Sequence, residues 1–180
     1  MRFFDTIFRE SNKNHEILGL TNELKGLYLY NKFNKDNQSI LLVTSSLYEA
    51  NQFYQIISNY TNKVFLFPMD DFLTSEAIAI SPELKITRIE TLNNLINDDK
   101  VIVITNLMGF LRYLPSKNIF KDNILELKVG QNYNIKEIID KLLDMGYSRE
   151  MIVNKTGEIA PRGYVVDIFP ISCINPIRIE

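Results

Sequence analysis

The sequence predicts an α/β fold: a parallel-sheet domain followed by a small α+β module. In the first two thirds of the chain, short apolar runs of strand length alternate with stretches of helical period. One run, KVIVIT at residues 100–105, is apolar on both faces, which is typical of a parallel strand covered by helices on both sides. After about residue 120 the predicted strands are short and glycine turns separate them, which favours antiparallel pairing.

Composition places the chain among globular proteins, because 46% of its 180 residues are hydrophobic and 11% are aromatic. Twenty basic residues stand against 22 acidic ones, and this net charge of −2 disfavours nonspecific DNA binding by this chain alone. The one cysteine, Cys173, has no internal disulfide partner. Charges interrupt the start MRFFDTIFRE, and no apolar run reaches the roughly 18 residues of a membrane helix. We therefore expect a cytoplasmic protein.

The first predicted domain covers residues 1–120. Its expected elements, in order, are a helix at 22–34, a strand at 39–44, a helix at 46–59, a strand at 63–67, a helix at 81–97 and a strand at 100–105. Ser46 is expected to cap its helix, with Glu49 completing a capping box, and Pro82 suits a first helical position.

The second predicted module covers residues 121–180, after a polar boundary segment at 115–122 that contains proline. Its expected elements are a strand at 124–129, a helix that Gly146 closes, a strand at 149–154 and a strand within GEIAPRGYVVDIFP at 157–170. In that stretch Gly157 and Gly163 predict turns. The core side of the strand is expected to be Val165, Ile168 and Phe169. We expect this truncated module to have an incomplete sheet with an open edge.

A nucleotide site is not supported by the sequence. The segment LGLTNELKG at 18–26 lacks the G-x-x-x-x-G-K-[ST] pattern, since Lys25 precedes Gly26 and no Ser or Thr follows it. Asp70 and Asp71 could hold magnesium after a strand, but we interpret them as turn caps. His15 beside Glu16 is read as a surface residue instead of a proton shuttle.

Two residues of the second module are also weighed from their surroundings. Cys173 is interpreted as a half-buried packing residue, because no base lies near it. Arg162 could be a solvated arginine beside a turn or a functional group, and the local pattern leaves both open.

Several motifs together resemble the N-terminal, UvrB-like region of the bacterial transcription-repair coupling factors (Mfd). These motifs are SPELKITRIETLNNL, KVIVIT, LRYLP, NPIRIE and the pattern G-Y-x(5)-V-x(3)-G-E-x(3)-R-G-x(3)-D-I-F-P at 146–170. UvrB shares the last pattern, but it carries an intact phosphate-binding loop and a long tyrosine-rich DNA-clamping hairpin where this chain has LGLTNELKG and PMDDFLTSEAIAIS. These two differences from UvrB favour a resemblance to the coupling factors instead of to UvrB.

The resemblance implies a degenerate RecA/P-loop-like domain and an adaptor that recruits UvrA in transcription-coupled nucleotide excision repair. It implies that Arg162 and Arg178 contact UvrA, and that this fragment has no enzymatic activity, cofactor or metal. The structural alternative is that both arginines are partners of Asp167 or Glu158 within the module. The parent would be an ATP-dependent DNA translocase that displaces stalled RNA polymerase, with ATP and magnesium in its motor domains. The alternatives are a UvrB-type ATP-dependent excision-repair subunit and a small-molecule-binding α/β domain.

Overall fold

The computed structural model describes residues 16–71, 81–171 and 173–180. The chain divides into two compact units, one of residues 1–80 and 93–112 and the other of residues 81–92 and 113–180. The predicted α/β class is confirmed. The division near residue 120 that the composition suggests stays a prediction.

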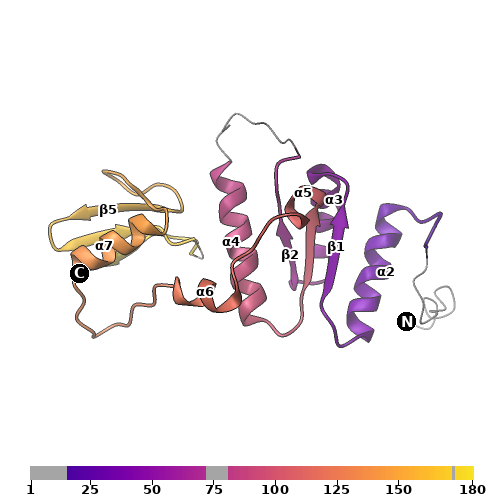
Figure 1. The fold of residues 1–180 in the computed structure, drawn as a ribbon, viewed down its shortest axis with the longest axis horizontal. Helices are drawn as coiled ribbons and strands as arrows, with labels where there is room; N and C mark the ends of the chain where they lie inside the picture. The colour runs from indigo at the N-terminus through magenta and orange to yellow at the C-terminus, as the bar shows by residue number, and fades with distance from the viewer. Residues whose placement is uncertain (1–15, 72–80, 172) are drawn as a thin grey trace. The chain divides into compact units, whose positions relative to one another are not determined.

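The first unit is built on a parallel three-stranded sheet (Figure 1). Its strands stand in the order β1 (Ile40–Thr44), β3 (Ile102–Asn106) and β2 (Val64–Phe67). All five residues of the central strand β3 are buried, as the apolar run predicts. Helix α3 (Leu47–Ser58) packs on the sheet, α2 (Asn22–Lys35) packs on α3, and the short α5 (Leu107–Phe110) follows β3 directly.

The first core lies between α3 and the sheet. Its buried side chains come from α2, α3 and the strands: Phe33, Ala50, Phe53, Ile57, Val64, Ile102 and Ile104. Gly26 lets α2 approach α3 closely, because a Cβ at this position would lie 2.5 Å from Cγ2 of Ile56. Helix α4 (Pro82–Asn97) begins in the second unit and ends in the first, and the short α6 (Lys117–Asp122) belongs to the second unit.

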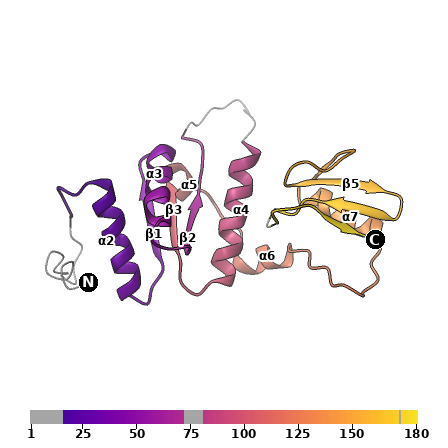
Figure 2. The same cartoon turned by 180° about the vertical axis from the view of Figure 1, so that it is seen from behind.

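The second unit holds a mixed four-stranded sheet. In order across the sheet its strands are β4 (Ser148–Arg149), β5 (Glu158–Arg162), β6 (Val165–Ile168) and β7 (Ile177–Ile179). Antiparallel pairing is confirmed for β5, β6 and β7, but β4 runs parallel to β5. Helix α7 (Ile135–Asp144) lies against one face of this sheet (Figure 2). Its Ile138 and Leu142 are buried against side chains of β5 and β6.

Glycines end and turn the chain where the sequence predicts. Gly146 has φ +95°, and the amides of Gly146 and Tyr147 donate to the carbonyls of Leu143 and Leu142, a Schellman motif at the end of α7. Gly163 has φ +65° in the two-residue turn between β5 and β6. Positive φ at the first turn position and not at Tyr164 is the pattern of a type II′ turn.

Three local predictions for the second unit are wrong. Residues 124–129 form no strand, although Leu125 and Leu127 pack against the core, because alternation orients side chains but supplies no backbone partner. The strand expected at 149–154 ends at Arg149, and side chains hold the loop that follows. The core side of β6 is Val166 and Ile168, so Ile168 is placed as predicted, whereas Val165 and Phe169 are not core residues. The error at these two positions arises because successive residues of a strand point to opposite faces.

Candidate protein-binding site

Arg162 and Arg178 lie on the same face of the second sheet. Strand pairing places Asp167 opposite both Arg178 and Ala160, and Arg162 follows Ala160 by two residues on β5. Side chains two residues apart share a face. Because Ile159, Val166 and Ile168 face α7, the two arginines belong to the opposite face.

Arg178 forms a bidentate ion pair with Asp167. Its Nε donates to Oδ1 at 2.7 Å and its Nη2 donates to Oδ2 at 3.0 Å. The Arg178 side chain is 56% exposed, whereas Asp167 is 16% exposed, so the pair fixes the guanidinium while leaving it open to solvent. The hydrogen bonds from Arg178, and then the positive charges of Arg178 and Arg162, hold the pKa of Asp167 below its usual value.

Arg162 is the last residue of β5 and is exposed. Its Nη2 donates to the backbone carbonyl of Met151 at 3.0 Å. Glu158, at the start of the same strand, accepts from the amides of Asn154 at 2.7 Å and Lys155 at 2.8 Å, and these bonds lower its pKa. Arg178 is therefore held by a carboxylate, whereas Arg162 is held by a loop carbonyl.

Sequence reasoning missed a buried polar junction at the carboxyl edge of the first sheet. Asn106, fully buried at the end of β3, donates from Nδ2 to the carbonyl of Met69 at 2.7 Å and to Asp71 at 2.6 Å. Its Oδ1 accepts from the amides of Met69 and Gly109. The available signal was a polar residue directly after an apolar strand, which is also typical of an ordinary turn.

The edge where a nucleotide would bind in this fold class holds acceptors from the chain itself. At the start of α3, Ser46 Oγ accepts from the amide of Glu49, and both carboxylate oxygens of Asp71 accept from the amide of Leu47 at 2.9 Å. Glu49 Oε2 accepts from the amide and hydroxyl of Ser45, so the predicted capping box reaches one residue earlier than expected.

The start of α2, like that of α3, holds hydrogen-bond acceptors from the chain itself. Thr21 caps the helix, and the hydrogen bonds that Glu23 receives from its own amide and from Thr21 lower its pKa. Helix N-termini attract anions through their free amides and positive dipole ends. At both helices described here, carboxylates of the chain already occupy that position.

The other sequence candidates have simple outcomes. Asp71 acts as a cap, as interpreted, and His15 lies outside the described residues. Cys173 is exposed and not half-buried, because it lies in the turn between β6 and β7, where its amide donates to the carbonyl of Pro170. Within the described ranges, no group of three or more His, Cys, Asp or Glu side chains could hold a metal ion, and no helix is long and apolar enough to cross a membrane.

Comparison with known proteins decides the relationship. Residues 125–180 match the family described as the UvrB interaction domain. The chain is 35% identical over 178 residues to the transcription-repair-coupling factor of Staphylococcus epidermidis, and 29% identical over 173 residues to that of Bacillus subtilis. The chain is related to the transcription-repair-coupling factors. The resemblance drawn from its motifs is confirmed.

The match covers nearly all of this chain but only a small part of each coupling factor. It includes 98% of this chain for the Staphylococcus epidermidis protein and 95% for the Bacillus subtilis protein, but 15% of either relative. The chain therefore spans about a seventh of the length of the curated relatives it matches. Both arginines fall inside the part that matches the UvrB interaction domain.

Proposed function

We propose that this chain is an adaptor that recruits UvrA in transcription-coupled nucleotide excision repair. The observation that carries the proposal is the pair of exposed guanidinium groups on the sheet face opposite α7. Arginine forms planar, bidentate bonds to carboxylates and is enriched at the centres of protein interfaces. The match of residues 125–180 to the UvrB interaction domain supports a protein as the partner.

Both guanidinium groups are already held by hydrogen bonds within the chain, and this supports a role in binding UvrA. A side chain that is already held loses less conformational entropy when it binds. Asp167 holds Arg178 by two hydrogen bonds, and the Met151 carbonyl holds Arg162 by one. Each guanidinium has five N–H donors, so these bonds leave others for a partner.

The direct test is the dissociation constant of UvrA from the wild-type chain and its variants. Arg162→Ala and Arg178→Ala are each expected to weaken binding about thirtyfold or more, the effect of losing an interface hot spot. Arg149→Ala is the matched control, because Arg149 is exposed on the same sheet but its partner Ile159 assigns it to the face toward α7. An unchanged dissociation constant for both test variants would rule out the arginine assignment.

A second control separates docking from stability. Asp167→Asn keeps the Arg178 side chain and an amide oxygen that can still accept one hydrogen bond. If Arg178 contacts UvrA, Asp167→Asn should bind far better than Arg178→Ala. If the ion pair only stabilises the sheet, the two variants should lose equal thermal stability and keep the affinity of the wild type.

We also infer that this chain does not hydrolyse ATP. The support is the set of carboxylates at the starts of α2 and α3, which would repel phosphate groups, together with the absence of a Walker sequence. Calorimetry with Mg-ATP should give no binding heat. Micromolar affinity would instead favour the UvrB-type ATP-dependent subunit.

For the longer protein, the proposal follows the family. It would be a cytoplasmic, ATP-dependent DNA translocase that displaces stalled RNA polymerase, with ATP and magnesium bound by motor domains outside these residues. The support is the similarity to coupling factors that are about seven times longer than this chain.

A further inference from the structure

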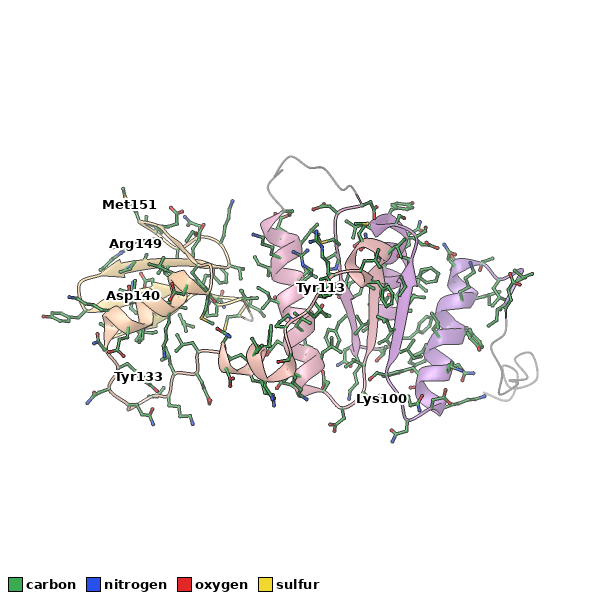
Figure 3. The ribbon with its side chains drawn as sticks, in the orientation of Figure 1. Lys100, Tyr113, Tyr133, Asp140, Arg149 and Met151 are labelled. Atoms are coloured by element: carbon green, nitrogen blue, oxygen red, sulfur yellow. The ribbon has the colours of Figure 1, made fainter. Side chains whose placement is uncertain are left out.

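The loop at 150–157, between β4 and β5, exposes two consecutive apolar side chains. Met151 is 90% exposed and Ile152 is 61% exposed. Figure 3 shows Met151 projecting away from the sheet. Single exposed apolar residues are common on protein surfaces and need no explanation. Met151 and Ile152 differ from such residues because side-chain hydrogen bonds hold the backbone of their loop.

Side chains anchor this loop at both ends. Arg162 donates to the carbonyl of Met151, and Glu158 accepts from the amides of Asn154 and Lys155. Asn154 also donates from Nδ2 to the carbonyl of Ile152 at 3.3 Å. Both anchors, Glu158 and Arg162, stand at the two ends of β5, so a strand of the sheet fixes the loop conformation.

We propose that Met151 and Ile152 form the apolar part of the docking surface whose cationic part is Arg162 and Arg178. The hydrogen bond from Arg162 joins the two parts directly. Arginine and methionine are both enriched at protein interfaces. The contacts that surround such residues exclude water, and this exclusion strengthens the ion pairs and charge-assisted hydrogen bonds at the centre of the interface. The occupant is the proposed partner UvrA, and the chemistry requires carboxylates beside an apolar patch on its surface.

This inference rests on the proposed function and adds a role for Glu158. A carboxylate beside a cationic surface should weaken the binding of an acidic partner, so charge alone predicts that Glu158→Ala binds UvrA equally or more tightly. If Glu158 positions the loop, the same variant should bind more weakly, because the loop must then be ordered on binding. The two explanations therefore predict opposite signs.

The experiment measures UvrA affinity for the whole chain with Met151→Ser, Ile152→Ser and Glu158→Ala. We expect each to weaken binding about three- to thirtyfold. Val129→Ser is the matched control, because Val129 is 107% exposed in the loop that Tyr133 closes by accepting from the Lys128 amide. Tyr133 and Met151 lie at opposite sides of the second unit in Figure 3.

Thermal unfolding verifies that each variant is folded, and amide exchange at Asn154 and Lys155 verifies that Glu158→Ala releases the loop. Wild-type affinity in both serine variants, or an equal loss in Val129→Ser, overturns the inference and leaves the arginine assignment intact. Tighter binding by Glu158→Ala overturns the positioning role. If the wild-type chain does not bind UvrA, the proposed function fails together with this inference.

Discussion

Asn106 is a fully buried residue of the first unit whose side chain makes four hydrogen bonds. Removing its side chain leaves the amides of Met69 and Gly109 and the carbonyl of Met69 without their partner in a buried site. Each buried group left unsatisfied costs roughly 1–3 kcal/mol. Asn106→Ala should therefore lower the free energy of unfolding by at least about 3 kcal/mol in urea titrations. Asn51→Ala, at an exposed position of α3, should change it little.

Asp167 makes the second unit sensitive to acid. Its folded pKa is lowered, so the stabilisation is present above the unfolded pKa of about 3.9 and is lost as the pH falls through the folded value. Asp167→Asn should melt below the wild type at neutral pH, and the gap should close as the pH falls below about 4. A gap that stays constant down to low pH would contradict a role for the Asp167 carboxylate.

At the scale of elements, the contact of α2 with α3 depends on Gly26. Alanine gains up to about 1 kcal/mol of helix propensity over glycine. The added Cβ would nevertheless meet Cγ2 of Ile56, a β-branched residue with little rotamer freedom in a helix. Gly26→Ala should thus destabilise the chain by about 1–3 kcal/mol. In an Ile56→Ala background the same change should be neutral or stabilising, and equal losses in both backgrounds would contradict the clash.

The start of α3 depends on its cap. Ser46→Ala removes the acceptor for the amide of Glu49 and should cost about 1 kcal/mol of unfolding free energy. Ser58→Ala, at the opposite end of the helix, is the comparison, because its hydroxyl donates to the carbonyl of Gln55 and caps no free amide. Equal effects of the two substitutions would argue against a capping contribution.

Elements set by local signals could be predicted, and those set by distant partners could not. Ser46, Gly146 and Gly163 act within a few residues, so the sequence indicates their roles. The alternating stretch at 124–129 meets the requirements of a strand except for a partner, which no local pattern supplies. Burial on both faces of residues 100–105 indicated that the first sheet is parallel, but the strand order β1-β3-β2 was not predicted. The parallel pairing of β4 with β5 spans only two residues and left no signal.

Some features of the candidate site could likewise be predicted from local sequence, whereas others depend on distant partners. Arg162 and Arg178 were named from a motif, but their common face depends on the register of β6 with its two neighbours. Glu158 and Met151 were missed because their importance lies in bonds across a loop. The position of glutamate directly after a turn glycine, Gly157, was the one available hint.

For the whole molecule, the second sheet predicts association between chains. Among the described strands, β7 pairs with β6 and with no other, so its outer backbone groups are free to pair. Light scattering should show association that grows with protein concentration. Ile177→Lys, which places a charge on this edge, should reduce it, whereas a strict monomer at high concentration would contradict the expectation.

The carboxylates at the start of α3 would make a phosphate-binding site hard to acquire at this position during evolution. Asp71 and Glu49 each satisfy backbone amides there, so replacing either one to admit a phosphate would remove a stabilising bond before any nucleotide could compensate for it. The turn at Ser45 and Ser46 also lacks the glycines that a phosphate-binding backbone requires. Intermediates toward a phosphate-binding site would be less stable before they bound any nucleotide, so this helix start resists conversion into such a site.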